Sequence, residues 1–289
     1  MPAAESTATT RILTSELTFP TAPTDALLAV WRLSVFAVTV GAIMIVIGLL
    51  RAVGVDTAGV RRAYYRFLAR VLGLRLVVRG RPSAAQPMLY VCNHISYLDI
   101  VAIGAVVKGE FVARGDMADW PFFGLMAKAG RTVFIDRRRT SAGEAKNAVQ
   151  RRLNEGGALI LFPESTSGDG NHILPFRSAL FTVAEAEVGG RPVTVQPMSI
   201  AYTRINGLPM GVGWRAFLAW YGDMTLGPHL WQALKLGSTT IEIEFHPPVT
   251  AAELGGRKAL AAHCQRLAAH GFARALAGRA AGPALTSRA

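Results

Sequence analysis

A histidine and an aspartate stand five residues apart in the segment 93–99, which reads NHISYLD. The apolar run Met88–Cys92 precedes them and predicts a strand, and α/β proteins present catalytic groups where such strands end. If a helix follows, a carboxylate on its first turn can reach back to the imidazole. Asp99 would then fix the tautomer of His94 and favour the imidazolium that forms when His94 takes a proton from a hydroxyl. The pattern indicates a general base and its partner, with the hydroxyl belonging to a substrate.

The same segment also allows a purely structural interpretation. Ser96 can cap the next helix, which puts Asp99 at the third helical position. The two residues then form a capping box, and His94 is an ordinary surface histidine. Sequence periodicity leaves both interpretations open.

A second polar segment follows the apolar run Ala158–Phe162, because residues 161–171 read LFPESTSGDGN. Glu164 could receive substrate hydroxyls there, while the small residues after it let a headgroup approach the backbone. A plain polar turn is the alternative, since serine, glycine, aspartate and asparagine are common turn residues. A calcium loop fails for want of further ligands. A serine-hydrolase elbow also fails, because Ser165 and Ser167 lack flanking glycines.

A third segment, residues 130–139, is rich in arginine and reads GRTVFIDRRR. Arg131 and Arg137 lie on either side of a short apolar run and could bind a phosphate or a carboxylate. A charged run is usually a solvated face, so this segment alone is a weak indication of an anion site.

Taken in this order, the three segments resemble motifs of the glycerolipid (lysophospholipid) acyltransferase family. Residues 93–99 match its N-H-x4-D block, 130–137 its block ending in F-I-x-R, and 162–166 its F-P-E-G-T block. Residues 195–198 (VQPM) are similar to its V-x-P block, and the likeness covers residues 75–250. It implies transfer of an acyl group from an acyl carrier protein or coenzyme A thioester to a lyso-lipid hydroxyl, without a bound cofactor or metal.

By the same resemblance, His94 is the base, Asp99 is its partner, and Arg137 and Glu164 bind the acceptor. Ser165 and Thr166 belong to the same acceptor-binding block.

Two departures from the family pattern bear on the acceptor. Ser165 stands where the family carries glycine, so a positive φ at this position would strain the backbone. Ser167 stands where lysophosphatidate acyltransferases usually carry a cation. The continuation 167–178 and the segment 220–224 (WYGDM) are more similar to the branch that acylates lyso-ornithine lipid.

The resemblance therefore implies an acceptor with a zwitterionic ornithine headgroup. Its ammonium could pair with Asp169 or Glu164, and its carboxylate with Arg137 or Arg177. Arg131 and Arg137 could instead serve a phosphate, so lysophosphatidate is the alternative acceptor.

Two other classes of protein are more distant alternatives. A membrane esterase would need a nucleophile of its own near His94, and the sequence offers no elbow to supply one. A non-enzymatic lipid-binding protein would use the apolar and basic segments equally well.

Residues 33–50 form an uncharged run of eighteen residues, and 26–31 extend it with only Arg32 between. This length approaches the roughly 20 residues that a membrane-spanning helix needs. A signal peptide is disfavoured because the run is too long, starts too far in and follows three acidic residues. We expect residues 26–50 to anchor the protein, either spanning or half-inserted, and a buried core helix or a re-entrant hairpin is the alternative.

Eight arginines and a single acid, Asp56, lie between residues 51 and 81. This excess predicts that the chain after the anchor faces the cytoplasm, at the inner membrane, where the arginines could hold anionic headgroups. Residues 60–74 carry apolar side chains at helical intervals, as in an amphipathic helix on a bilayer or an ordinary domain helix. The net charge of +12 fits a membrane surface better than nucleic acid, for which no recognition motif is present.

Strand-like and helical segments alternate after residue 75, which predicts an α/β fold with a mixed, largely parallel sheet flanked by helices. Strands are expected at 75–80, 88–93, 110–114, 132–136, 158–162, 193–202 and 239–245. Helices are expected at 96–107, 118–129, 142–155, 175–188 and 251–277. The expected organisation is a tail (1–25), an anchor with a basic amphipathic helix (26–74), an acyltransferase domain (75–277) and a second tail (278–289). Cys92 and Cys264 cannot make a disulfide framework.

Overall fold

The computed structural model describes residues 23–120, 123–135, 149–279 and 285–286. Its strands are β1 (Leu74–Arg79), β2 (Met88–Cys92), β3 (Glu110–Arg114), β4 (Val133–Ile135), β5 (Ala158–Leu161), β6 (Glu187–Val188), β7 (Arg191–Pro192), β8 (Thr194–Ile205), β9 (Leu208–Pro209), β10 (Thr239–Phe245), β11 (Val249–Thr250) and β12 (Leu285–Thr286). Its α-helices are α2 (Pro23–Ala52), α3 (Ala58–Val71), α4 (Leu98–Val106), α5 (Phe123–Ala129), α7 (Val212–Leu218), α8 (Leu226–Lys235) and α9 (Arg257–Leu276). There are also two 3₁₀ helices, η1 (Gly115–Asp119) and η2 (Ser178–Glu185). Residues 149–154 are helical as well, and the first part of the helix expected over 142–155 lies outside the described residues.

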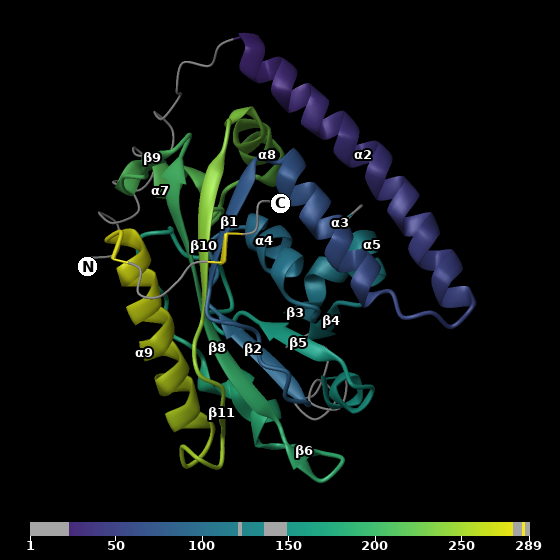
Figure 1. Cartoon of the computed structure of the whole chain (residues 1–289), viewed down its shortest axis with the longest axis vertical. Helices are drawn as coiled ribbons and strands as arrows, with labels where there is room; N and C mark the ends of the chain where they lie inside the picture. The colour runs from purple at the N-terminus through teal and green to yellow at the C-terminus, as the bar shows by residue number, and fades with distance from the viewer. Residues whose placement is uncertain (1–22, 121–122, 136–148, 280–284, 287–289) are drawn as a thin grey trace.

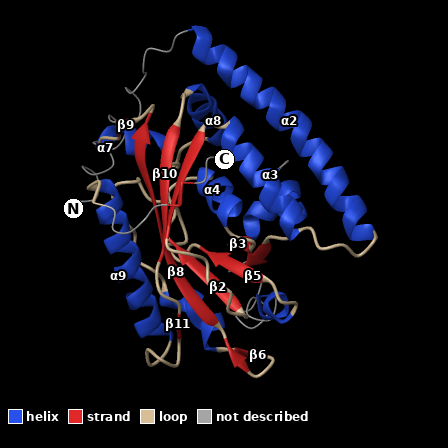
Figure 2. Ribbon diagram, viewed as in Figure 1, coloured by secondary structure: helices blue, strands red, loops and turns tan. Residues whose placement is uncertain are grey.

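The described strands form one large mixed sheet in the order β12-β1-β10-β8-β2-β5-β3-β4, with β9 and β11 beside β8. Strands β8, β2, β5, β3 and β4 all run parallel to their neighbours in this half of the sheet. Strand β10 runs antiparallel to β8, and β1 runs parallel to β10. Helices cover the sheet (Figures 1 and 2), so the predicted α/β class with a largely parallel sheet is confirmed.

Strand β2 shows how the sheet divides two cores. Successive side chains of a strand point to opposite faces. Met88 and Tyr90 join a core with α4 and β10, whereas Leu89 and Val91 join a core with α9. Because β2 is buried on both faces, its sequence is a continuous apolar run rather than an alternating one.

Several elements differ from the sequence prediction. The helix expected over 118–129 is interrupted: Trp120, which precedes Pro121, has the extended φ of −68° and ψ of 126°, and α5 begins only at Phe123. The helix expected over 175–188 is a 3₁₀ helix that ends at Glu185. The last helix begins at Arg257, later than expected, because two glycines with positive φ precede it.

Helix α2 is long and apolar enough to cross a membrane over Thr24–Ala52, with a mean hydropathy of 2.7. Only 11% of its most apolar window is buried, and many of its large apolar side chains are exposed. This exposure argues against a core helix of the protein interior and is what a membrane anchor requires. Figure 1 shows α2 lying alongside the rest of the molecule, next to α3 and α8.

Several arginines expected to meet lipid headgroups contact protein groups instead. Arg51 donates to the carbonyl of Ala129 at the end of α5 (2.7 Å), and Arg66 donates to that of Ala105 near the end of α4 (3.0 Å). Such contacts satisfy carbonyls that have no partner within their own helix. Within the described residues, the exposed Arg70, Arg75 and Arg81 remain for a membrane surface.

Candidate active site

His94 and Asp99 form a hydrogen-bonded pair where β2 ends. Nδ1 of His94 lies 2.8 Å from Oδ2 of Asp99. Asp99 is fully buried, whereas the His94 side chain is 20% exposed. With Nδ1–H donated to Asp99, the lone pair of the neutral imidazole lies on Nε2, which is the atom that can accept a proton from a substrate hydroxyl.

Three further donors hold the Asp99 carboxylate. Oδ2 accepts from the backbone N–H of Ile95 (2.7 Å) and of Ser96 (3.0 Å), and Oδ1 accepts from the Tyr202 hydroxyl (2.7 Å). Together with His94, these groups hold the buried side chain of Asp99 in place. The capping box proposed for Ser96 and Asp99 is not formed: Asp99 accepts from the N–H of Ser96, but α4 has Tyr97 as its N-cap and no side chain caps it.

The imidazole of His94 is also held by an aromatic neighbour. Its ring stacks on Phe162 with centroids 4.2 Å apart and an interplanar angle of 16°, and Phe162 stacks in turn on Phe111. One edge of the ring is therefore fixed by Asp99 and one face by Phe162. Nε2 is left as the ring nitrogen that has no hydrogen bond to another described residue.

Glu164 faces the backbone rather than an open site. Oε2 accepts from the N–H of His94 (2.5 Å), and Oε1 accepts from the N–H of Leu174 (2.7 Å). The residue is 3% exposed, and burial raises the pKa of Glu164 to about 8. Glu164 thus joins the main chain of His94 to that of Leu174, a role that the sequence did not suggest.

The rest of this loop lies against the dyad. The N–H of Gly168 donates to the carbonyl of His94 (2.9 Å). Ser165 has a φ of 69°, the left-handed conformation that the family glycine would adopt without strain. Thr166 is exposed.

Ser167 and Trp220 connect two segments that both resemble the lyso-ornithine branch. The Ser167 hydroxyl donates to the carbonyl of Trp220, and the N–H of Trp220 donates to the carbonyl of Ile95 (3.0 Å). The loop after Glu164 and the segment 220–224 thus form adjoining walls beside His94. Their proximity could not be read from the sequence, since more than fifty residues separate them.

Asp169 organises its own turn beside these walls. Its carboxylate accepts from the N–H groups of Asn171 (2.9 Å) and His172 (3.0 Å). Burial opposes ionisation, but these hydrogen bonds and the His172 side chain lower the pKa of Asp169 overall. Asn171 in turn accepts from Nε of Arg215 (2.7 Å), which ties the turn to α7.

The three predicted arginines lie in different places. Arg177 is exposed, and its backbone N–H donates to the carbonyl of Pro163 (2.9 Å). Arg131 precedes β4, at the edge of the sheet opposite to His94, and its guanidinium pairs with Glu110 (2.7 Å). The structure therefore does not bring Arg131 together with His94. Arg137 lies outside the described residues.

Sequence reasoning missed Tyr202 and the pair formed by Tyr97 and His229. The Tyr97 hydroxyl lies 3.0 Å from Nδ1 of His229, next to the ring of Trp220. A tyrosine in a buried strand such as β8 is a usable signal, because a buried hydroxyl needs a hydrogen-bond partner. Which partner it has depends on tertiary contacts.

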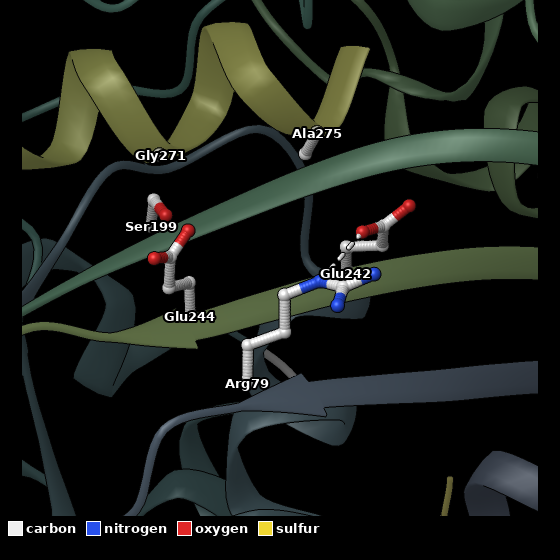
Figure 3. Close-up of a pocket in the computed structure, with 6 residues that line it drawn as sticks. All are labelled: Arg79, Ser199, Glu242, Glu244, Gly271 and Ala275. Atoms are coloured by element: carbon white, nitrogen blue, oxygen red, sulfur yellow. Dashed lines mark hydrogen bonds and ion pairs between the residues drawn. The ribbon is translucent and has the colours of Figure 1, made fainter. Parts of the chain in front are cut away.

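A small cavity lies on the other face of the sheet and is separate from this site. It lies against α9 (Figure 3) and is lined by Arg79, Ser199, Glu242, Glu244, Gly271 and Ala275. Ser199 and Tyr202 are three residues apart on β8 and so point to opposite faces. The cavity therefore has no access to the dyad.

The comparisons with known proteins agree with this geometry. Residues 75–201 match the family model described as Acyltransferase. The chain belongs to this family and is an acyltransferase. The match contains the dyad, Glu164 and the arginine-rich segment, which are the motifs on which the sequence resemblance rested.

Individual relatives extend the match beyond the family model. The chain is 42% identical over 202 residues to the lyso-ornithine lipid O-acyltransferase of Brucella abortus, covering 68% of this chain and 76% of the relative. It is 39% identical to the enzyme of the same name from Rhizobium meliloti, covering 64% of each chain. It is 33% identical to the 1-acyl-sn-glycerol-3-phosphate acyltransferase of Neisseria gonorrhoeae, covering 63% of this chain and 68% of the relative.

A solved structure is similar to the whole fold. The 1-acyl-sn-glycerophosphate acyltransferase from Thermotoga maritima superimposes with a TM-score of 0.62 over 89% of this chain and 97% of its own. Its sequence identity is 19%, so this likeness concerns the fold alone.

Proposed function

We propose that this acyltransferase moves a fatty acyl group from an acyl carrier protein or coenzyme A thioester to the hydroxyl of lyso-ornithine lipid. Nε2 of His94 takes the hydroxyl proton as the oxygen attacks the thioester carbonyl. The new C–O ester bond forms, the C–S bond breaks, and the thiolate leaves with the proton that His94 returns. The observation that carries this proposal is the 2.8 Å pair of His94 Nδ1 and Asp99, which leaves Nε2 to accept the proton.

Asp99 supports this reaction by its charge and its fixed position. A full positive charge forms on His94 while the proton is held, and a carboxylate at 2.8 Å stabilises that charge. Tyr202 and the backbone N–H groups keep the carboxylate in place, so little reorganisation is needed during the reaction. Glu164 holds the backbone of His94 from the other side.

The acceptor is proposed from two observations. Relatives at 36–42% identity are named lyso-ornithine lipid O-acyltransferases. The loop next to the dyad also carries Asp169, whose lowered pKa keeps a negative charge where an ornithine ammonium would be favoured. Ser167 donates to the Trp220 carbonyl and supplies no cation for a phosphate. Arg137 and Arg177 are the proposed partners of the ornithine carboxylate.

Kinetics with one thioester donor and two acceptors test this choice. Purified protein should acylate lyso-ornithine lipid with a higher kcat/KM than lysophosphatidate. Asp169→Asn keeps an oxygen that can accept the hydrogen bonds of the turn but removes the negative charge. It should therefore reduce the difference in kcat/KM between the two acceptors. The matched control is Asp116→Asn, at an exposed aspartate. A clear preference for lysophosphatidate would refute the acceptor and leave the acyl transfer standing.

We propose further that the protein attaches to the cytoplasmic membrane through residues 26–74, with the catalytic unit of residues 75–277 in the cytoplasm. Arg32 and Arg51 of α2 both contact that unit. They are 19 residues apart, or roughly 28 Å along a helix, so α2 lies against the catalytic unit over most of its length. This favours a half-inserted helix over one that leaves the domain and crosses the bilayer.

Protease treatment of sealed vesicles with the cytoplasmic face outward distinguishes the two arrangements. Epitope tags are placed at both ends of the chain. A half-inserted anchor exposes both tags, whereas a spanning anchor protects the N-terminal one. Protection of the C-terminal tag would contradict the cytoplasmic orientation.

A further inference from the structure

Arg32 interrupts the apolar run of α2, yet its side chain is buried against protein. The residue is 4% exposed, and its guanidinium donates to the carbonyls of Leu234 (3.0 Å), Leu236 and Gly237 (2.8 Å). These carbonyls lie at the C-terminal end of α8, where a helix has no N–H groups of its own to offer them. Placing a cation in an apolar, membrane-associated helix costs free energy, so such a residue usually has a functional contact.

The surroundings of this guanidinium are shaped to receive it. Gly73 has a φ of 71°, and a side chain at this position would lie 2.7 Å from Nη2 of Arg32. The backbone of Gly237 closes the same space. The absence of a side chain at Gly73 lets the arginine reach the carbonyls at the end of α8.

Helix α8 in turn holds the loop that carries the dyad. Nε2 of His229 lies 3.0 Å from the carbonyl of Phe217, and Nδ1 lies 3.0 Å from the Tyr97 hydroxyl. A carbonyl only accepts, so Nε2 carries the proton and Nδ1 accepts from Tyr97. Burial lowers the pKa of His229 and favours this neutral form. Tyr97 directly follows the two residues whose N–H groups bind Asp99.

We propose that Arg32, α8, His229 and Tyr97 form a tie that makes the position of the catalytic loop depend on the docking of α2. In this anchor tie, α2 has two separable roles: its apolar surface attaches the protein to the membrane, and Arg32 positions the loop. Arg32, His229 and Tyr97 are positioning residues, because they act on the dyad through the loop. The inference rests on the proposed function, since acyl transfer is its readout.

Arg32→Leu in the full-length protein separates the two roles. Leucine makes α2 more apolar, so sedimentation with liposomes should be as strong as for the wild type or stronger. The kcat for acyl transfer in those liposomes should nevertheless fall about tenfold, because a catalytic group that is held loosely spends less time in its reactive position. The matched control is Arg191→Leu, an exposed arginine on the β6–β7 hairpin, which should change neither quantity.

A pair of substitutions at His229 tests the same tie independently of the anchor. Glutamine offers one acceptor and one donor, so His229→Gln should keep most of the turnover, whereas His229→Leu should lose about as much as Arg32→Leu. Thermal unfolding must show equal stability for the two His229 variants. Rescue by glutamine between equally stable proteins identifies the hydrogen bonds, rather than packing, as the cause.

The double variant Arg32→Leu/His229→Leu shows whether the two residues act through one path. Coupled residues give non-additive losses, so the double variant should lose little more than either single one. The proposal is overturned if folded, membrane-bound Arg32→Leu keeps its kcat, if His229→Leu equals His229→Gln, or if the losses multiply. A wild type that transfers no acyl group would instead refute the proposed function.

Discussion

Buried carboxyl groups lie at both ends of the parallel strands, and the two edges of the sheet hold these groups differently. At the carboxyl edge, Asp99 and Glu164 are held by N–H groups, a tyrosine hydroxyl and an imidazole. Among the described residues no lysine or arginine contacts either carboxylate. At the amino edge, Glu110 lies between the guanidinium groups of Arg61 (3.6 Å) and Arg131 (2.7 Å), with Arg152 nearby (3.4 Å).

This difference separates a reactive edge from a structural one. Three arginines surround the Glu110 side chain, so we assign it a structural role rather than a role in binding a ligand. At the other edge, Asp99 has no lysine or arginine contact among the described residues and can respond to a positive charge that appears during the reaction. The imidazolium of His94 is such a charge.

The largest loss of activity is expected from substitutions of His94 and Asp99, which remove the reactive groups of the carboxyl edge. His94→Ala should lower kcat by roughly 10²–10⁴-fold, the usual contribution of a general base. Asp99→Asn should also lose much of the kcat, because it removes the negative charge that stabilises the imidazolium. Turnover with an acyl thioester and circular dichroism measure activity and folding. A folded His94→Ala protein with near-normal turnover would leave only the capping role of this segment.

A second prediction concerns Glu164, whose burial without a cationic partner should make the stability of the protein depend on pH. Burial raises the pKa of Glu164 from 4.5 to about 8 in the folded protein. Below pH 4.5 the carboxyl group is protonated in both states; between 4.5 and 8 only the folded protein keeps the proton. The free energy of unfolding should therefore fall as pH rises through this window, by up to about 1.4 kcal/mol per pH unit.

Urea unfolding in detergent at pH 5, 6.5 and 8 measures this slope. Glu164→Gln has no proton to lose and should flatten it, whereas the exposed Glu187→Gln should leave it unchanged. An unaltered slope in Glu164→Gln would show that other groups cause the dependence.

The third prediction concerns Glu110, the carboxylate that three arginines surround at the amino edge. Glu110→Gln leaves three arginines facing one another and should lower the free energy of unfolding by about 3 kcal/mol. The kcat of the folded fraction should stay unchanged, since this edge lies a strand's length from His94. Glu155→Gln is the control: its side chain is 52% exposed, so its loss should cost less than about 1 kcal/mol. A large loss of kcat in a folded Glu110→Gln protein would contradict the division between the edges.

The two edges also differ in how far the sequence could predict them. The bounds of β3 and β10 agree with the sequence pattern, because apolar runs between turn residues determine strands locally. The pairing of His94 with Asp99 was predictable for the same reason, since both lie in one strand-to-helix turn. Arg131 was expected in the acceptor site, but a motif does not show which end of the neighbouring strand a charge lies near.

The contacts that the sequence could not supply all join distant segments. Tyr202 reaches Asp99 across 103 residues, and Arg32 reaches α8 across more than 200. Neither short spacing nor periodicity records such contacts. The first contact depends on the sheet order, which places β8 beside β2, and the second on the packing of α2 against α8.

The smallest loss of activity is expected from a substitution of Tyr202. This residue shows how much a neutral hydrogen-bond donor contributes at the edge where no cation holds the carboxylate. Its hydroxyl lies 2.7 Å from Oδ1 of the fully buried Asp99, and burial raises the pKa of Tyr202 well above its usual range. The hydroxyl therefore stays protonated and donates throughout the working pH range. Tyr202→Phe removes one donor of several, and a hydrogen bond to a charged group contributes about 1.5 kcal/mol or somewhat more.

We therefore expect the kcat of Tyr202→Phe to fall about tenfold, far less than that of Asp99→Asn. Tyr90→Phe is the matched control, because the Tyr90 hydroxyl donates to the carbonyl of Ser83 and does not touch the dyad. Parallel measurements of kcat and of thermal unfolding separate positioning from stability. If Tyr202→Phe loses as much activity as Asp99→Asn, the hydroxyl is essential to the charge state of Asp99. If it loses none, the backbone N–H groups of Ile95 and Ser96 hold the carboxylate without it.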